Sequence, residues 1–321
     1  MSATLRQRPL GHTEIEVGAI GLGCMGFSIA YDPGTKSDAS SMLVIERALD
    51  LGVTLFDTSD AYGPWVNEEL VGRALAGRRS EAVIATKAGC APNTKSFVPV
   101  PDGRPEVLRR CCDASLARLG VETIDLWQLH RVDPLVPIEE SVGAMGEMVD
   151  AGKVRAIGVS EVTLEQLDAA QRTFPLAAVQ SELSLWTRDA LGEIVPWCAT
   201  HNVAFVAFAP LGRGFLTGAI HAERSFAAND VRAANPRFTV EARLANQPIL
   251  DVVRGVAARR DATLAQVALA WVLAQGDHVI AIPGSDQMHF LEENVAADAL
   301  RLTGPDLREL DAIPAATGTR Y

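Results

Sequence analysis

Short apolar segments alternate with longer helix-like segments along most of this chain. Most of the short segments are continuous apolar runs, the pattern of strands that are buried on both faces. Strands of this kind are typical of a parallel sheet. The eight predicted strands are residues 18–22, 53–56, 82–86, 124–129, 154–159, 178–180, 203–207 and 278–282.

The longer segments carry apolar residues at i, i+3 and i+4 spacing, which predicts helices with one buried face. The clearest of them are residues 39–51, 67–75, 105–119, 138–151, 164–170 and 264–275. Gly52, Gly120 and Gly152 stand just beyond helix ends, and Thr163 and Thr263 are suited to N-caps. The chain therefore repeats a strand, a loop and a helix.

This repeat predicts an α/β fold in which eight parallel strands close into a (β/α)8 barrel. No Pro-rich or Ser-rich linker divides the 321 residues. Barrels of this type commonly fill about 250 residues or more as one unit. We therefore expect residues 1–321 to form a single barrel domain.

Three stretches lie outside the simple repeat. Residues 8–17 predict an N-terminal β-hairpin with its turn at Gly11, His12 and Thr13. Residues 90–104 and 213–246 predict long loops after the third and seventh strands. Loops after barrel strands emerge at the carboxyl-terminal face, where active sites are built, so both are candidate substrate-binding walls.

The charge balance argues against polyanionic partners. Lys and Arg number 29 against 40 Asp and Glu, a formal net charge of −11. A protein that binds nucleic acid or an anionic membrane usually carries a basic patch instead. The N-terminal residues include no apolar signal-peptide core, and no apolar run reaches the roughly 20 residues of a membrane span. We expect a cytoplasmic protein.

The cysteines and histidines give no sign of a disulfide framework or a metal site. The five cysteines are odd in number and form no CxxC pair. The six histidines are scattered rather than clustered with carboxylates. We expect reduced thiols and no bound metal.

Residues 21–26 match the GxGxxG pattern of dinucleotide-binding loops directly after a predicted strand. In a Rossmann fold that motif opens a helix. Here Pro33 and Gly34 follow, and the helical pattern resumes only near Ala39. The glycines are better suited to a tight turn at the end of the first strand, where Met25 and Gly26 could face a ligand.

Polar side chains stand at the ends of successive predicted strands. Asp57 and Tyr62 follow the second strand, Lys87 ends the third, and His130 follows the fourth. Singly, each has a structural explanation, such as a helix cap, a surface ion pair or a satisfied buried histidine. Together they describe a proton donor: Lys87 would lower the pKa of the Tyr62 phenol, Asp57 would hold the ammonium, and His130 would orient a substrate oxygen. Such a group suits carbonyl reduction.

The segments LFDTSDAYG, ATK, LWQLHR, IGVSE, AVQSELSLWTRD, FAPLGRGFLTG and IPGS followed by LEEN resemble the aldo-keto reductase superfamily. The resemblance extends in order over nearly the whole chain. DTSDAYGPWVNEE, GVSE and SLWTRD are most similar to a branch of plant and bacterial carbonyl reductases that includes relatives of potassium-channel β-subunits. The resemblance implies a (β/α)8 barrel that binds a nicotinamide dinucleotide without a Rossmann domain.

The resemblance also implies a role for each matched position. Asp57, Tyr62, Lys87 and His130 correspond to the family's catalytic residues. Ser160 and Gln180 match the residues that hold the nicotinamide carboxamide, and Phe208 matches the ring on which nicotinamide stacks. Residues 209–214 match the loop around the pyrophosphate, and Gly284, Ser285, Glu293 and Asn294 match the adenosine end. The implied cofactor-binding set is Met25, Gly26, Asp57, Ser160, Gln180, Phe208, Ala209, Pro210, Leu211, Arg213, Gly214, Gly284, Ser285, Asp286, Glu293 and Asn294.

Trp65, Trp186 and Arg188, together with His130, are the candidates for the substrate pocket. Core packing is the alternative for the two tryptophans. The substrate itself stays open among aldehydes, ketones, sugars and secondary alcohols, and so does the formation of a homo-oligomer.

The cofactor prediction depends on the segment after the eighth strand. NADP(H) is the default in the family, whose members commonly place a basic residue here to hold the 2′-phosphate. This chain has Asp286 and Gln287, and Phe290 stands where a basic residue is frequent. A carboxylate repels a phosphate but accepts a hydrogen bond from a ribose 2′-hydroxyl, so NAD(H) is the alternative.

Three functions follow from these residues. The leading one is an NAD(P)H-dependent oxidoreductase that moves a hydride between nicotinamide and a carbonyl or alcohol. A nicotinamide-binding regulatory subunit with little turnover is the second. The third is a different barrel enzyme in which Lys87 forms a Schiff base.

Overall fold

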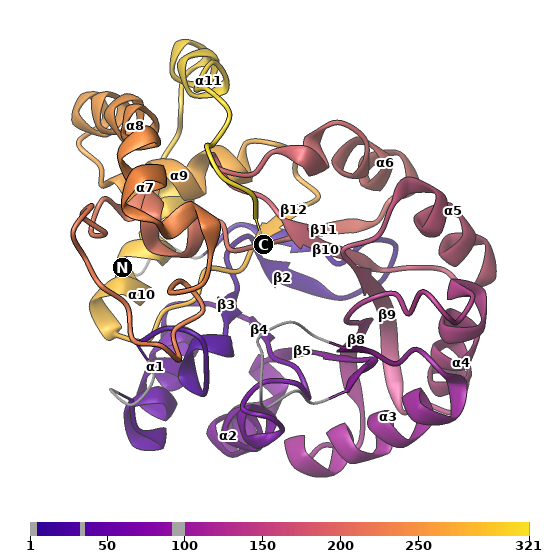
Figure 1. Cartoon of the computed structure of the whole chain (residues 1–321). Coiled ribbons are helices and arrows are strands. Elements are labelled where there is room, and N and C mark those ends of the chain that lie inside the picture. Colours follow the sequence, from indigo (N-terminus) through magenta and orange to yellow (C-terminus); the bar gives the residue numbers. More distant parts are fainter. Residues whose placement is uncertain (1–4, 33–35, 92–99, 321) are drawn as a thin grey trace.

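The protein is an eight-stranded parallel barrel surrounded by helices, as the sequence predicts (Figure 1). The computed structural model describes residues 5–32, 36–91 and 100–320. The strand order is β12-β11-β10-β9-β8-β5-β4-β3. Parallel bridges from Ile20 to Ala281 and from Gly23 to Gly284 join the first strand to the last and close the ring. The barrel strands are β3 (Leu22–Gly23), β4 (Leu55–Asp57), β5 (Val83–Ala88), β8 (Ile124–Leu129), β9 (Val154–Ser160), β10 (Ala178–Glu182), β11 (Ala204–Phe208) and β12 (Val279–Ala281).

The first barrel strand lies later in the chain than its apolar pattern indicates. Gly18 ends the hairpin strand β2, and β3 begins only at Leu22. The intervening residues cross from the hairpin to the barrel wall and make a single bridge at Ile20. Gly23 sits where a Cβ atom would come within 2.9 Å of the Ile282 carbonyl oxygen, so only glycine lets the first and last strands approach.

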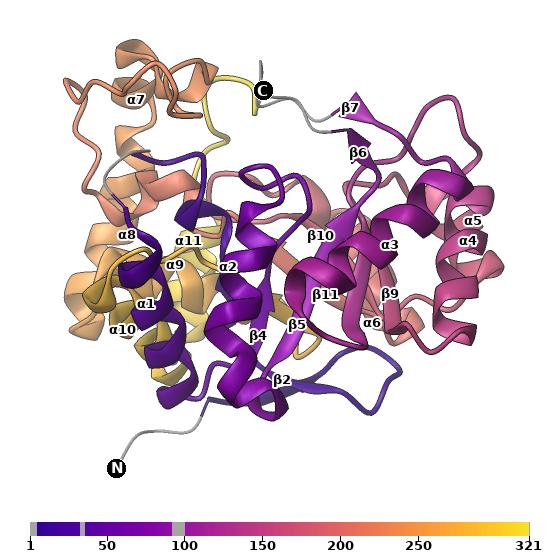
Figure 2. The same ribbon diagram turned by 90° about the horizontal axis from the view of Figure 1, so that it is seen from below.

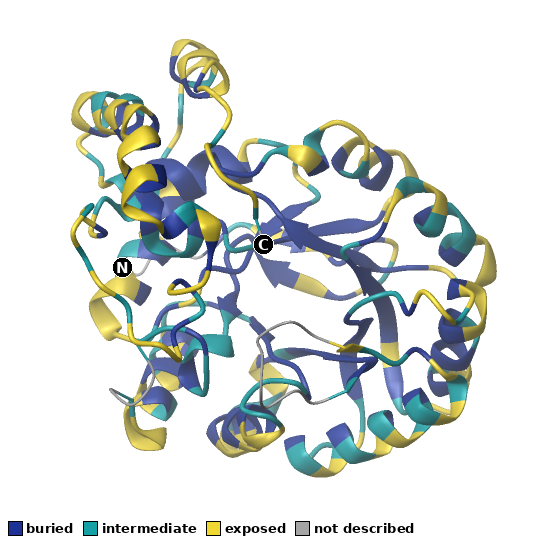
Figure 3. Ribbon diagram, viewed as in Figure 1, coloured by how far each residue is buried: buried dark blue, intermediate teal, exposed yellow. Residues whose placement is uncertain are grey.

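Helices cover the outside of the barrel and bury the face that points at the strands (Figures 1 and 3). Capping boxes at Thr163 and Thr263 begin two of them, as predicted. The sequence analysis did not single out the helices at Ile194–His201, Val240–Ala245, Gln247–Arg260 and Gly304–Asp311. The helices are α1 (Asp38–Asp50), α2 (Val66–Leu75), α3 (Pro105–Leu119), α4 (Ile138–Asp150), α5 (Leu164–Thr173), α6 (Ile194–His201), α7 (Val240–Ala245), α8 (Gln247–Arg260), α9 (Leu264–Leu273), α10 (Met288–Ala296) and α11 (Gly304–Asp311).

The N-terminal hairpin closes one end of the barrel. Strands β1 (Gln7–Pro9) and β2 (Glu16–Gly18) pair antiparallel, and the turn between them holds Gly11 in a left-handed conformation with φ of 62°. Leu10, Ile15 and Val17 pack against inward-facing residues of the barrel strands. Figure 2 shows β2 at the end of the barrel opposite to β6 and β7. The hairpin thus excludes water from the amino-terminal end.

Side-chain alternation along the strands separates the helix-packed face from the barrel interior. Phe56, Trp127 and Phe205 belong to the core between the sheet and the helices. Leu55, Leu126 and Val206 belong to the interior cluster with the hairpin. Nearer the carboxyl ends of the strands, several inward-facing residues are polar instead of apolar. They include Asp57, Lys87, Gln128, Ser160 and Gln180.

Long segments rise above the carboxyl-terminal end of the barrel. In the first predicted wall, β6 (Cys90–Ala91) and β7 (Val100–Pro101) pair antiparallel, while residues 92–99 lie outside the described residues. The second wall contains short 3₁₀ turns and α7. The chain's last described segment packs along this wall, since Asn246 bonds the backbone of Thr317 and Asn235 bonds the Arg320 carbonyl.

All five cysteines are free thiols. Across residues 5–32, 36–91 and 100–320, no three His, Cys, Asp or Glu side chains are grouped closely enough to hold a metal ion. Within the same ranges, no helix combines the length and apolar character needed to cross a bilayer.

Candidate active site

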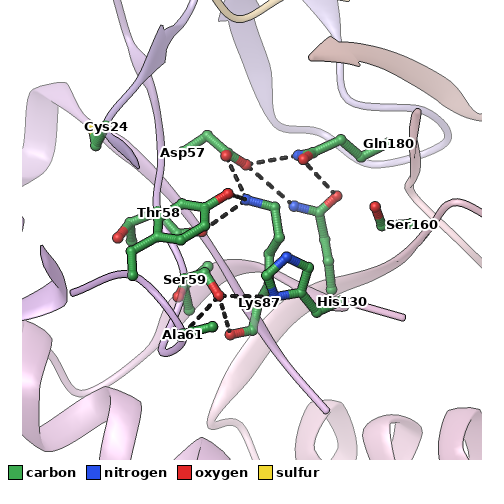
Figure 4. A network of polar contacts seen from close by, with 12 residues as sticks. Cys24, Asp57, Thr58, Ser59, Ala61, Lys87, His130, Ser160 and Gln180 are labelled. Atoms are coloured by element: carbon green, nitrogen blue, oxygen red, sulfur yellow. Dashed lines mark hydrogen bonds and ion pairs between the residues drawn. The ribbon is translucent and has the colours of Figure 1, made fainter. Parts of the chain in front are cut away.

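A buried ion pair between Asp57 and Lys87 forms the centre of the site. Asp57 ends β4 and Lys87 lies near the end of the neighbouring strand β5, both facing the barrel interior. The Lys87 ammonium is 2.5 Å from Asp57 Oδ1 and also donates to the Thr58 carbonyl at 2.9 Å (Figure 4). The two side chains are only 1% and 4% exposed. A buried lysine stays charged only when it has such hydrogen-bonding and charged partners. Burial alone would lower the pKa of Lys87, but Asp57 and Tyr62 raise it above its usual value.

Tyr62 completes this centre from the turn that follows β4. Its hydroxyl lies 3.2 Å from the Lys87 ammonium, which also sits 5.0 Å from the centre of the phenol ring. The turn is held by backbone bonds from Tyr62 N to Ser59 O and from Asp60 N to Lys87 O. The structure thus places the ammonium between a carboxylate and a phenol.

The net effect of the site on Tyr62 differs from the sequence expectation. Burial raises the pKa of the Tyr62 phenol, Lys87 lowers it and Asp57 raises it, and the pKa ends above its usual 10. Lys87 does lower the pKa of the phenol, as the sequence suggested, but burial raises it by more. The phenol is therefore protonated at neutral pH and can donate.

His130 follows β8 and faces Tyr62 edge to face, with ring centres 6.0 Å apart. Burial lowers the pKa of the imidazole well below its usual 6.5, and the charges of Arg131 and Lys87 lower it further. The ring is therefore neutral at pH 7. Its Nδ1 lies 3.1 Å from the Ser59 hydroxyl.

Gln128 and Arg131, which the sequence analysis did not single out, complete the network together with the expected Gln180 and Ser160. Gln180 Nε2 donates to the second Asp57 oxygen at 2.7 Å, and Gln128 Nε2 approaches the same oxygen at 3.5 Å. Arg131 donates to the Ser160 hydroxyl at 3.2 Å. Gln128 lies two residues before His130 on the same face of the strand. The period of two along a strand could therefore have identified Gln128 as a site residue from the sequence.

The expected pyrophosphate loop has the geometry of a backbone cradle. After Phe208 ends β11, positive φ angles occur at Ala209 (47°), Gly212 (56°), Arg213 (56°) and Gly214 (94°). Pro210 and Leu211 complete this turn. The Arg213 guanidinium lies 3.0 Å from Glu182 at the end of β10. The arginine is thus held at the carboxyl-terminal face with a carboxylate beside it.

The expected adenosine site lies where β12 leads into α10. Ser285 and Asn294 are buried and hydrogen-bonded to each other, with Asn294 Nδ2 donating to Ser285 Oγ at 2.8 Å. Gly284 is exposed beside the first strand, and Glu293 is half-buried on α10. The α10 N-cap, Gln287, makes no side-chain capping bond. The uncapped N–H groups of this helix start can face an anion.

Asp286 does not present the unpaired charge that the sequence suggested. Its carboxylate lies 3.0 Å from the Lys36 ammonium, which also donates to the carbonyls of Gly26 and Tyr31. Gly26 belongs to the 3₁₀ turn at Met25–Phe27 directly after β3. This pairing was not visible in the sequence because it depends on β3 and β12 being neighbours in the closed barrel.

The structure separates the candidates for the substrate pocket. Trp65 is 47% exposed in the turn that also carries Tyr62. Trp186 is buried, and its indole stacks on Phe215 with ring centres 4.2 Å apart. Arg188 donates to the carbonyls of Leu310 and Asp311 at the end of α11. We therefore leave Arg188 out of the pocket, because its guanidinium is committed to a helix end.

The barrel and the buried cluster at its carboxyl-terminal face define a barrel enzyme. Residues 19–315 match the model of the aldo/keto reductase family. "Probable aldo-keto reductase 1" of Glycine max is 43% identical over 99% of this chain and 92% of its own length. The chain therefore belongs to the aldo-keto reductase family, whose members are NAD(P)H-dependent oxidoreductases of carbonyl compounds and alcohols.

Solved structures give the same result. The glycerol dehydrogenase of Gluconobacter oxydans superposes with a TM-score of 0.86 and 32% identity, covering 96% of this chain and 94% of that one. An aldo-keto reductase of Klebsiella pneumoniae, solved with NADP and acetate, has a TM-score of 0.73 and 26% identity, with 98% and 99% covered. Both similarities extend over nearly the full length of this chain.

Proposed function

We propose that this chain reversibly transfers a hydride between a nicotinamide cofactor and a carbonyl compound, with Tyr62 as the proton donor. The observation that carries the proposal is the Lys87 ammonium, which contacts both the Asp57 carboxylate and the Tyr62 hydroxyl inside a buried site. The cofactor, when bound, supplies the hydride. The residues of the chain then have to orient the carbonyl and neutralise the charge that develops on its oxygen.

Each residue of the cluster has a role in this proton transfer. In reduction the Tyr62 hydroxyl gives its proton to the carbonyl oxygen, and Lys87 stabilises the phenolate that is left. Asp57 holds the ammonium in place. His130 donates a second hydrogen bond to the same oxygen. In the oxidation of an alcohol the steps reverse, and the phenolate accepts the proton.

The residues at the carboxyl-terminal face fit a dinucleotide that lies across the barrel. Ser160 and Gln180, at the ends of β9 and β10, would hold the nicotinamide carboxamide, and Phe208 offers a half-buried ring for stacking. The cradle at residues 209–214 would face the pyrophosphate, and Gly284, Ser285, Glu293 and Asn294 the adenosine end. Met25 and Gly26 follow β3 beside them.

We propose NADP(H) as the first choice of cofactor, with NAD(H) as the alternative. Lys36 balances the charge of Asp286 at the adenosine end, so the carboxylate repels a 2′-phosphate less than the sequence suggested. The Klebsiella relative was solved with NADP. The NAD(H) alternative is based on Gln287 and Phe290, which are uncharged and provide no positive charge to bind a 2′-phosphate.

One relative supports a proposal for the substrate class. We propose a small polar carbonyl compound or the corresponding alcohol, since one relative is a glycerol dehydrogenase. Within the family we propose the plant and bacterial branch that includes relatives of potassium-channel β-subunits; the plant relative from Glycine max supports only the plant part of this assignment. We also propose that the barrel acts as a single domain, in the cytoplasm.

The test is the oxidation of NADPH and NADH followed by absorbance across aldehydes, ketones and sugars, with wild type and Tyr62→Phe. Proton transfer by a positioned side chain is worth about 10²–10⁴ in rate. Tyr62→Phe should lose that much reductive kcat while its cofactor Kd stays within a few fold. A Tyr62→Phe enzyme with near wild-type kcat would refute the mechanism. Tight cofactor binding without turnover in wild type would instead support a regulatory subunit.

A further inference from the structure

Ser59 lies beside His130, in the turn after β4, and is completely buried (Figure 4). Its hydroxyl oxygen is 3.1 Å from His130 Nδ1 and accepts the backbone N–H of Ala61 at 3.1 Å. The Lys87 carbonyl and Asp60 Oδ1 are each 3.3 Å away. Nothing in the proposed mechanism so far assigns a role to this hydroxyl.

The contact matters because a neutral imidazole carries only one N–H. Burial and the charges of Arg131 and Lys87 keep the pKa of His130 low, so the ring is neutral at pH 7. In a neutral histidine the hydrogen bond made by one nitrogen determines which nitrogen holds the proton. The partner of Nδ1 therefore decides whether Nε2 is a donor or an acceptor.

The geometry favours one direction for the bond. A serine hydroxyl has one hydrogen to give, and this oxygen already accepts the N–H of Ala61. Of the acceptors around it, His130 Nδ1 is the nearest, at 3.1 Å against 3.3 Å for the Lys87 carbonyl and the Asp60 carboxyl. Nδ1 is thus the nearest acceptor for the hydroxyl hydrogen, and accepting this bond requires Nδ1 to be unprotonated.

We propose that Ser59 is a positioning residue that holds neutral His130 in the tautomer with its proton on Nε2, so that Nε2–H donates to the substrate oxygen. This inference rests on the proposed role of His130 in carbonyl reduction. In the opposite tautomer Nδ1–H would donate to Ser59, and Nε2 would present a lone pair to the carbonyl oxygen. The site would then lose the Nε2–H hydrogen-bond donor, and the Nε2 lone pair would repel the carbonyl oxygen.

The direct test is ¹H–¹⁵N correlation spectroscopy of the histidine side chains at pH 7.5. The chain has six histidines, and His130→Gln identifies the resonances of His130 by their loss. We expect wild type to carry the proton on Nε2, with the Nδ1 resonance displaced by a hydrogen bond. In Ser59→Ala that resonance should move to the position of an unbonded imidazole nitrogen, and some Nδ1–H tautomer should appear.

Ser115→Ala is the matched control, since Ser115 is an equally buried serine on α3 whose hydroxyl accepts a hydrogen bond from Arg118. It should leave the His130 resonances unchanged. A wild-type proton on Nδ1, or His130 resonances that are identical in wild type and Ser59→Ala, would overturn the inference. These readouts do not depend on turnover.

Kinetics then separate this inference from the proposed function. Ser59→Ala should lower kcat for carbonyl reduction about tenfold, with little change in the Kd for the cofactor, and Ser59→Thr should restore most of it by returning the hydroxyl. Full activity in His130→Gln would refute the role proposed for His130 while leaving the spectra of Ser59→Ala to decide the tautomer. If Ser59→Ala lowers kcat and Ser59→Thr restores it, but the His130 resonances do not change, the tautomer inference is refuted. The proposed function would then still stand.

Discussion

The carboxylate of Asp57 and the ammonium of Lys87 form an ion pair that is almost completely shielded from water, with N and O atoms 2.5 Å apart. Removing one partner of such a pair leaves the other as an uncompensated buried charge, which commonly costs about 3–5 kcal/mol. The pair is therefore a part of the fold as well as a part of the site.

Asp57→Asn should lower the free energy of unfolding by about that amount, because Lys87 loses its carboxylate. Lys87→Met should lower it too, since Asp57 would remain buried and charged. The double variant should recover part of the loss, as both charges are gone. Urea denaturation of the four proteins measures this. Strictly additive effects of the two changes would contradict a direct coupling between the side chains.

The raised pKa of Tyr62 predicts opposite pH dependence for the two reaction directions. Reduction needs the protonated phenol, so its rate should stay level through neutral pH and fall only above about pH 10. Oxidation needs the phenolate, so its rate should rise with pH toward that pKa. In Lys87→Met the alkaline limb should move to higher pH, because the cation that lowers the pKa is gone. Profiles of kcat/KM that are level in both directions would contradict this.

Asp60 predicts a pH dependence of stability. Burial, followed by the charge of Glu68, raises its pKa from 3.8 to about 7 in the folded protein. Between about pH 4 and 7 the folded state therefore binds more protons at this group than the unfolded state does. The contribution of Asp60 is fully present below about pH 4 and falls as the pH rises through this window, by up to about 1.4 kcal/mol per pH unit.

Asp60→Asn should remove that decline, so the variant gains stability relative to wild type between pH 5 and 8. Denaturation curves at several pH values measure the difference. Asp251→Asn, at an exposed carboxylate on α8, is the matched control and should leave the pH dependence unchanged. A constant difference between Asp60→Asn and wild type across this range would show that Asp60 is ionised throughout.

The pair of Lys36 and Asp286 predicts a shift in cofactor choice. Lys36→Met should leave an unpaired carboxylate at the adenosine end and lower the kcat/KM ratio of NADPH over NADH about tenfold, or roughly 1.4 kcal/mol. Asp286→Arg should raise the same ratio by at least about tenfold. The variant with both Lys36→Met and Asp286→Ser carries neither charge and should fall between them. Ratios equal to wild type in all three would place this pair away from the ribose.

Much of the fold was readable from local patterns. The continuous apolar runs and the helical periodicity identified the barrel, the hairpin at residues 8–17 and the polar strand ends at Asp57, Lys87 and His130. The first strand was placed too early because the apolar run continues from the hairpin, where Gly18 pairs with Gln7, into the barrel strand that begins at Leu22. The hydrogen bonds of Arg188 to the end of α11 could not be foreseen, because that helix lies far from Arg188 in the sequence.

The sequence by itself determined which residues face the barrel interior, because the period of two along each strand is a local property of the backbone. Only the tertiary structure decided which of those side chains meet. Closure of the barrel brings β3 beside β12 and so pairs Lys36 with Asp286. The contact of Ser59 with His130 likewise depends on the turn after β4 reaching the end of β8. Such pairings depend on distances across the fold, which no periodicity in the chain encodes.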